Sequence, residues 1–229
     1  SSLLCETSPG LLFVRPFLPP LRMFIIGAVH IAQDLAVMAQ RSGYDVTLID
    51  PRDTWATPER FPGLIIDRRM PSEAIIDLRP DQRTAIVALC HDPKLDDPAF
   101  VESLKSKACY MGALGSRKNH AGRVTRLAEY GFDESYFARI KGPIGLNIGA
   151  ATPAEIAVSI LAEAIQLVQS ITDVPLSIDS SIIEALEAGL AVYQGKALVN
   201  SVTGEDEVLE RVLPLVANSG PSVAAISND

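Results

Sequence analysis

Two segments of the sequence place glycines and polar side chains where an apolar run gives way to a helical pattern. In "MFIIGAVHIAQ" the turn falls at Gly27, and in "YMGALGSRKNH" it holds Gly112, Gly115, Ser116 and Arg117. A helix that begins after such a turn presents free backbone N–H groups and the positive end of its dipole, which together bind phosphate groups. The hydroxyl and the guanidinium of the second segment suit the same ligand. The sequence therefore predicts an anion-binding edge built from two loops.

The first segment matches part of the dinucleotide fingerprint G-x-G-x-x-G/A. Gly27 and Ala32 fit the first and third places, whereas Val29 occupies the second, where a side chain narrows the approach to a pyrophosphate. Asp50 ends the next strand-like run, 23 residues after Gly27 in the sequence. In dinucleotide-binding folds, an acid at about this sequence separation binds the ribose hydroxyls. These residues leave two alternatives open, an NAD(P)-type dinucleotide site and a strand-turn-helix with a structural role. His30 begins the helix either as a titrating group or as a solvated one.

Two further loops bring polar groups to the same predicted edge. His91 follows the apolar run "TAIVALC", and Asn147 lies in "GPIGLNIGAA" before a strongly helical segment. Loops at the carboxyl ends of parallel strands commonly carry function. Asp92, Asp96 and Asp97 follow His91 and could share a site there, but the favoured interpretation of each is a loop residue or a helix cap before "PAFVESL".

These loops need a parallel sheet to hold them together. Strand-like and helical runs alternate along the chain, which predicts a doubly wound, Rossmann-like α/β fold. Thr152, Pro153 and Glu155 form a capping box at the start of the clearest helix. Before residue 23 the proline-containing lead-in is expected to be irregular. The predicted strands are 23–27, 45–50, 63–67, 84–90 and 108–114, and the predicted helices are 31–42, 71–76, 98–105, 119–130 and 151–170.

The bulk composition excludes several classes of protein. The 229 residues are 48% hydrophobic and 21% charged, enough for one large or two small globular domains. A net charge of −8 argues against a nucleic-acid surface, and no apolar run is long enough to span a membrane, so a cytoplasmic protein is expected. Three cysteines without a CxxC motif predict neither a disulfide framework nor a metal site. The predicted partner is a small molecule or another protein.

The ordered motifs "FIIGAVHIAQDLA", "DVTLIDPR", "HDPKLDDPAF", "YMGALGSRKNHAGR" and "GPIGLNIGAATPAEIAVSILAEAI" resemble the Rossmann-type domain of the xanthine dehydrogenase accessory (XdhC/CoxI) family over about residues 10–168. The resemblance implies a maturation factor that holds a molybdopterin-type cofactor for a molybdenum hydroxylase. Because Val29 replaces a glycine that the family usually has, this activity is expected to be weakened or lost here. With Ala28 added from the first turn, the positions that fall on the family's motifs are Gly27, His30, Asp50, Arg52, His91, Gly112, Gly115, Ser116, Arg117 and Asn147.

The last part of the chain is similar to another family. The segments "VPLSIDSS" and "KALVNSVTG" resemble the pterin-binding (β/α)₈ barrel of methyltetrahydrofolate:corrinoid methyltransferases. The resemblance implies that Asp179 and Asn200 contact a pterin. Only three of the eight barrel strands are expected, at about 174–180, 196–204 and 222–229, with helices between them at about 182–193 and 205–216. We therefore expect a βαβαβ fragment of TIM-barrel type. This fragment either extends the first sheet or packs beside it.

The predicted organisation is a lead-in at 1–22, an XdhC-like Rossmann domain at 23–168 and a partial-barrel segment at 169–229. Two families that meet inside one helix favour the hypothesis of an engineered or recombined chimera. Three functions stay open: cofactor binding, a scaffold without catalysis, and folate-dependent methyl transfer. Catalysis is the less favoured outcome because the barrel is incomplete. An exposed final strand also allows edge pairing in a homodimer.

Overall fold

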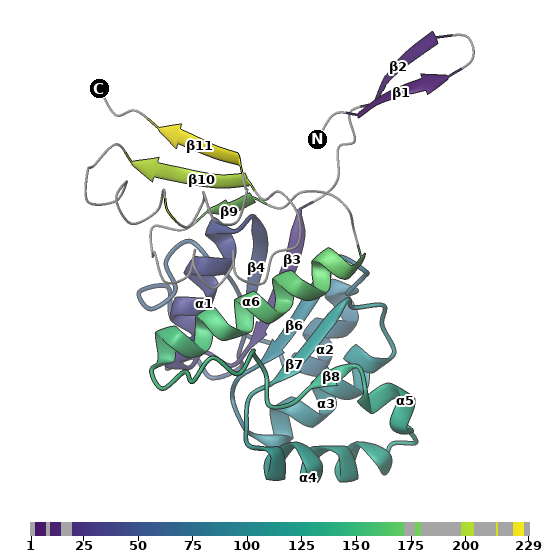
Figure 1. The fold of residues 1–229 in the computed structure, drawn as a ribbon. Helices are drawn as coiled ribbons and strands as arrows, with labels where there is room; N and C mark the ends of the chain where they lie inside the picture. The colour runs from purple at the N-terminus through teal and green to yellow at the C-terminus, as the bar shows by residue number, and fades with distance from the viewer. Residues whose placement is uncertain are drawn as a thin grey trace.

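A computed structural model describes residues 3–7, 10–14, 20–171, 177–179, 198–203, 214 and 222–226. Its main body is a parallel sheet of six strands in the order β5-β4-β3-β6-β7-β8, with helices on both faces (Figure 1). The strands are β3 (Leu21–Ile26), β4 (Tyr44–Ile49), β5 (Ile65–Asp67), β6 (Thr84–Ala88), β7 (Tyr110–Ala113) and β8 (Ile140–Lys141). The helices are α1 (His30–Arg41), α2 (Pro71–Leu78), α3 (Pro93–Leu104), α4 (Arg117–Ala128), α5 (Glu134–Phe137) and α6 (Pro153–Ile171).

The strand order confirms the predicted doubly wound fold. Strand β3 pairs with β4 on one side and with β6 on the other, so the order reverses beside β3. In such sheets, ligands bind outside the carboxyl ends of the strands at the reversal. The loops after β3 and β6 therefore define the place where a site is expected.

Alternate residues of β3 serve the two faces of the sheet. Met23 and Ile25 join a core that includes α1 and α6, whereas Phe24 and Ile26 join a second core with α2 and α3. All four side chains are essentially buried. The continuous apolar strand is typical of a parallel sheet covered on both sides.

Helix α6 forms as its sequence predicts. The Glu155 N–H donates to Thr152 Oγ1 at 3.2 Å, and Glu155 Oε2 accepts from the Thr152 N–H at 2.9 Å. This reciprocal pair is the capping box. The helix packs against α1, and its residues Ala157, Ile160 and Ala164 are fully buried.

Helix α3 begins five residues earlier than the sequence predicts. Asp92 caps it by accepting a hydrogen bond from the Lys94 N–H at 3.0 Å, and Pro93 takes the first helical position. As a consequence Asp96 and Asp97 are buried helical residues, not loop residues. The expectation that they lie in a loop is wrong.

The lead-in also differs from the prediction. Strands β1 (Leu3–Thr7) and β2 (Gly10–Val14) pair in an antiparallel hairpin, so this part is not irregular throughout. The sequence also missed β8 and α5, which have only two and four residues and leave no periodic pattern.

The C-terminal strands form a sheet of their own. Strands β9 (Ser177–Asp179), β10 (Leu198–Thr203) and β11 (Ser222–Ile226) are parallel, in the order β11-β10-β9. The alternative in which they extend the first sheet is therefore wrong. The helices predicted at about 182–193 and 205–216 lie outside the described residues, apart from Pro214.

Candidate functional site

The first turn, after β3, packs directly against the loop that follows β6. Gly27 has φ +103°, and a Cβ at this residue would lie 2.7 Å from Cys90 Cβ and 2.9 Å from the Cys90 backbone N. Only glycine tolerates both the backbone conformation and this approach. Gly27 therefore closes the two loops onto each other at the reversal of strand order.

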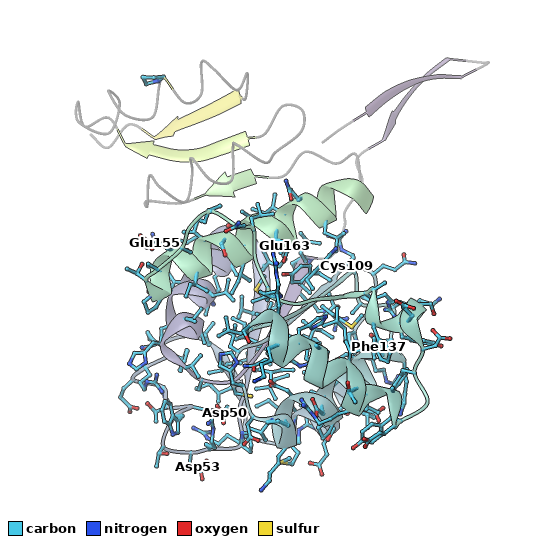
Figure 2. The ribbon with its side chains drawn as sticks, turned by 60° about the horizontal axis from the view of Figure 1, so that its bottom comes forward. Asp50, Asp53, Cys109, Phe137, Glu155 and Glu163 are labelled. Atoms are coloured by element: carbon cyan, nitrogen blue, oxygen red, sulfur yellow. The ribbon has the colours of Figure 1, made fainter. Side chains whose placement is uncertain are left out.

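Asp50, labelled in Figure 2, directly follows β4 and is hydrogen-bonded to the first turn. Its carboxylate is fully buried and accepts from the Ala28 N–H at 2.7 Å. Arg52 adds its backbone N–H at 2.9 Å and two guanidinium nitrogens at 2.9 and 2.6 Å. Burial pushes the pKa of Asp50 upward, but these hydrogen bonds outweigh it and hold that pKa below its usual value. The carboxylate is thus occupied by the protein itself, as is the Ala28 N–H.

A segment after β4 lies over the same turn. The Arg60 guanidinium donates to the Ala28 carbonyl at 2.9 Å and to the Trp55 carbonyl at 2.6 Å, and it lies over the Trp55 ring. Val29, the N-cap of α1, has no side-chain capping bond and packs in part against the core. His30 is exposed. Nothing in the sequence indicated a role for Arg60, because its contacts join residues that only the fold brings together.

The second loop contains glycines with two different roles. Gly112 lies inside β7, where a Cβ would collide with Ile144 Cδ1, so this glycine makes room for packing. Gly115 has φ +139°, and Ser116 caps α4 by accepting from the Asn119 N–H at 3.2 Å. A Cβ on Gly115 would lie 3.2 Å from Asn119 Cβ and 3.6 Å from His91 Nδ1, so Gly115 lies between these two residues. Its positive φ is the reason that glycine is required here.

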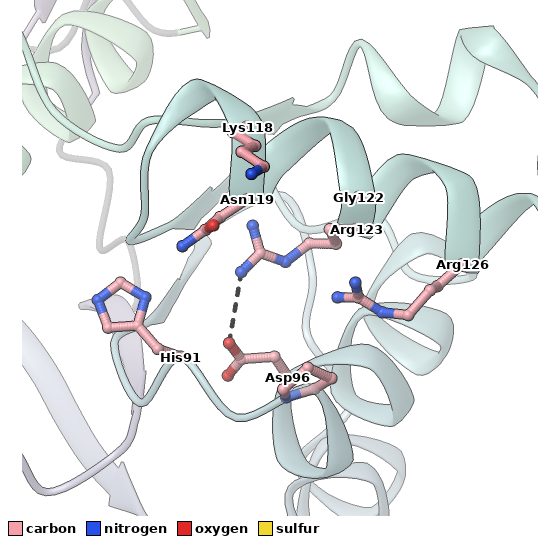
Figure 3. Close-up of a pocket in the computed structure, with 8 residues that line it drawn as sticks. His91, Asp96, Lys118, Asn119, Gly122, Arg123 and Arg126 are labelled. Atoms are coloured by element: carbon pink, nitrogen blue, oxygen red, sulfur yellow. Dashed lines mark hydrogen bonds and ion pairs between the residues drawn. The ribbon is translucent and has the colours of Figure 1, made fainter.

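A polar cavity of about 290 Å³ opens beside this loop, between α3 and α4 (Figure 3). We call it the α3–α4 pocket. Of the residues predicted from the sequence, it contains His91 alone, and Arg117 is exposed outside it. Its principal lining residues are His91, Pro93, Asp96, Lys118, Asn119, Arg123 and Arg126.

Buried charges form the floor of the α3–α4 pocket. Asp96 is 1% exposed, and it accepts from the Cys90 thiol at 2.8 Å and from Arg123 Nη2 at 3.4 Å. Burial raises the pKa of Asp96 in spite of these two donors. Arg126 pairs with Asp97 through both carboxylate oxygens. Within the described part of the chain, Arg123 Nε and Nη1 are buried and have no hydrogen-bond partner.

His91 has a backbone conformation that is uncommon for its type. Its φ of +59° lies in the left-handed region, although the side chain is exposed. Residues held in this region cluster at binding and catalytic sites, where the surrounding structure fixes them. Here the conformation sets His91 at the edge of the α3–α4 pocket.

The loop that contains Asn147 is held by a partly buried hydrogen-bond network. Glu163 Oε2 of α6 accepts from the Tyr110 hydroxyl at 2.5 Å and from the Gly145 N–H at 2.8 Å. Burial and the neighbouring Glu163 raise the pKa of Tyr110 well above its usual value. Asn147 is exposed and does not line the α3–α4 pocket. The loop that contains Asn147 is thus held in place by hydrogen bonds, but Asn147 itself lies outside the pocket.

The predicted site residues fall into separate groups. Gly27, Ala28, Asp50 and Arg52 form the braced first turn, and Gly115 and Ser116 adjoin His91 at the α3–α4 pocket. Asp179 and Asn200 are register partners on the neighbouring strands β9 and β10. Gly112 was predicted to lie in the second anion-binding turn, and this placement is wrong. It lies within β7, where the absence of a Cβ makes room for Ile144.

Comparisons with known proteins identify relatives of both parts. Residues 23–164 match the family described as the XdhC Rossmann domain, and residues 148–229 match the family described as pterin binding enzyme. The molybdenum cofactor insertion chaperone PaoD of Escherichia coli is 30% identical over 147 residues, which are 64% of this chain and 40% of PaoD. A probable xanthine dehydrogenase subunit of Bacillus subtilis is 30% identical over 156 residues, 68% of this chain and 45% of that protein.

A solved structure agrees with this similarity. A crystal structure from Bacillus halodurans, described as a xanthine dehydrogenase, superimposes with a TM-score of 0.59 at 26% identity. The match covers 68% of this chain and 44% of that one. The chain therefore spans less than half the length of these relatives. In the described residues, no helix is both long and apolar enough to cross a membrane.

Proposed function

This chain belongs to the XdhC Rossmann-domain family, and we propose that it acts as an accessory protein in the maturation of a molybdenum hydroxylase. Its role is to bind a molybdopterin-type cofactor, or a related phosphate-bearing pterin or nucleotide, at the carboxyl edge of the six-stranded sheet. The observation that carries the proposal is the buried Arg123 guanidinium, unpartnered at two nitrogens, in a polar pocket of that edge. A relative that is described as a molybdenum cofactor insertion chaperone supports the choice of cofactor.

The two loops fit such a ligand unequally. At the first turn the Ala28 N–H and the Asp50 carboxylate, which a dinucleotide would need, already bind each other. Around the α3–α4 pocket, by contrast, Lys118 and Arg123 supply charged donors, and Asn119 supplies an amide. These residues would hold a phosphate and orient the attached pterin toward the loop of His91. The geometry thus argues against a dinucleotide bound at the first turn and favours a phosphate in the α3–α4 pocket.

The pterin-binding similarity of the C-terminal part supports a shared ligand chemistry. Asp179 and Asn200 stand side by side in the β9–β10 register, as pterin contacts from neighbouring strands would. A carboxylate accepts from pterin N–H groups, and an amide both donates and accepts. An eight-stranded barrel builds its site from the loops of many strands, whereas the described residues of this part form three, so we do not propose methyl transfer from them.

Ligand titration of the full chain tests the proposal. The single tryptophan, Trp55, is 41% exposed beside the first turn, so its fluorescence reports binding at this edge of the sheet. We expect saturable binding of a molybdopterin-type cofactor, and no saturable response to NAD or methyltetrahydrofolate. Thermal shift provides a second readout that does not depend on where Trp55 lies. Flat responses to every ligand in both assays would leave the scaffold hypothesis in place of this one.

A further inference from the structure

The pairing of Arg123 is incomplete for so buried a charge. The residue is 4% exposed, and its guanidinium contacts the Asp96 carboxylate at 3.4 Å and lies over the Phe100 ring at 5.5 Å. A contact of 3.4 Å is long for an ion pair, in which the donor and acceptor atoms normally lie about 2.7–2.9 Å apart. Two further nitrogens of the guanidinium find no acceptor among the described residues. Leaving buried donors unpaired costs stability, so such a group calls for a missing partner.

The surroundings of Arg123 specify the charge of that partner. Lys118 and Arg126 from α4 add two cations to the same pocket, against the single carboxylate of Asp96. Arg126 is already paired with Asp97, but Lys118 is exposed and lies beside Asn119 on α4 (Figure 3). Asn119 offers an amide at the same wall. The pocket therefore lacks negative charge and hydrogen-bond acceptors.

We propose that the α3–α4 pocket is an oxyanion site that binds a phosphate group, with the Arg123 guanidinium as its central donor and Lys118 as its outer cation. A phosphate presents the acceptor oxygens that the planar guanidinium fork matches. The two unpartnered nitrogens are covered in the structure, so entry of the phosphate requires the wall of the pocket to open. The identity of the phosphate carrier as a pterin rests on the proposed function, but the oxyanion site does not.

The oxyanion site lies at one of the two loops that the sequence predicts for anion binding. The sequence offers both loops, whereas the structure uses the Ala28 N–H of the first turn for Asp50. Gly27 also packs against Cys90, which leaves no opening between the two loops at that point. The free donors lie instead on α4, one loop further along the sheet. Val29 then bears little on phosphate affinity.

Inorganic pyrophosphate tests the pocket without assuming any carrier. Calorimetric titration of the full chain at low ionic strength should show one saturable site. Arg123→Lys keeps the positive charge but removes the planar guanidinium that can donate two parallel hydrogen bonds. We expect it to weaken pyrophosphate binding by about tenfold or more, because one charge-assisted hydrogen bond is lost. Lys118→Ala should weaken it by about three- to fivefold, because this cation is exposed.

Lys107→Ala is the matched control. It removes the same charge from an exposed lysine that precedes β7, at the opposite end of the strand from the pocket. Its affinity should stay within about twofold of the wild type, since exposed distant charges are screened. Equal losses in Lys118→Ala and Lys107→Ala, or no saturable binding in the wild type, would overturn the oxyanion site.

The two proposals fail in different ways. Pyrophosphate binding without binding of a molybdopterin-type cofactor would keep the oxyanion site and remove the proposed function. Cofactor binding that Lys118→Ala leaves unchanged would keep the function and remove the site. If Arg123→Lys does not fold, as judged by circular dichroism, the exposed Lys118 variant still decides the outcome.

Discussion

Replacing Asp50 by Asn should lower the free energy of unfolding by about 2–4 kcal/mol. The buried carboxylate receives hydrogen bonds from the Ala28 N–H, the Arg52 N–H and two Arg52 guanidinium nitrogens, at 2.6–2.9 Å. An amide offers one acceptor oxygen in place of two, and its NH₂ group would face donors that have lost their acceptor. Each donor left unsatisfied costs about 1–3 kcal/mol, and water recovers part of this for the partly exposed Arg52.

Urea unfolding of the wild type and the Asp50→Asn variant measures this loss of stability. Repeating the measurement at several pH values tests whether the ionised carboxylate is its cause. Because hydrogen bonding holds the pKa of Asp50 below its usual value, the stabilisation is complete above about pH 4. It is lost as the pH falls through the lower pKa of the folded state. The difference between the two proteins should therefore be constant near neutrality and shrink in acid.

Asp53→Asn is the control for Asp50→Asn. Asp53 pairs with Arg68 at the surface, where its side chain is 83% exposed, so its replacement should leave the unfolding free energy within about 0.5 kcal/mol. If Asp50→Asn leaves stability unchanged and abolishes ligand binding, Asp50 is a ligand group. That result would refute the structural role of Asp50, in which its carboxylate stabilises the first turn through hydrogen bonds.

Three other changes test the packing and the thiol chemistry of the fold. Glu163→Ala should cost about 1–3 kcal/mol in urea unfolding, because the buried Tyr110 hydroxyl loses its acceptor. Gly112→Ala should cost about 1–3 kcal/mol by overpacking, and an added Ile144→Ala, which makes room for the new Cβ, should reduce the penalty relative to Ile144→Ala alone. Burial raises the pKa of Cys109 to about 11, so its alkylation by iodoacetamide should accelerate about tenfold per pH unit between pH 7 and 10, as followed by mass spectrometry.

The fold was predictable where its signals are local. Alternating runs and the capping box at Thr152 and Glu155 depend on neighbours within one turn or strand, and the structure confirms them. The start of α3 could not be predicted from the sequence, because "HDP" and "DDP" both offer a capping residue followed by a proline. The fold uses the first, and Pro98 lies inside the helix. Burial of Leu95 favours the earlier start, and burial is a tertiary property.

The α3–α4 pocket was less predictable than the fold. Arg123 and Asp96 lie on different helices, and a charged residue within a helix is most often solvent-exposed. Their sequence therefore indicated nothing of the buried contact. Asp50 and Arg52 are different, since an acid two residues before an arginine was visible in the sequence. The sequence could not show that the Asp50 carboxylate accepts the Ala28 N–H, which is then not free to bind a ligand.

Helix α6 bears on where the two parts of the chain meet. The two family matches overlap over residues 148–164, which includes the first half of this helix. Yet Ala157, Ile160 and Ile165 are buried in the same core as Met23, so the helix covers the six-stranded sheet through Ile165. We therefore propose a boundary at about residue 168, after the last turn of α6 whose burial the structure describes. If the chain is a chimera, residues up to Ile165 must preserve the helical face of the first parent, because a shift of one residue would rotate apolar side chains away from the sheet.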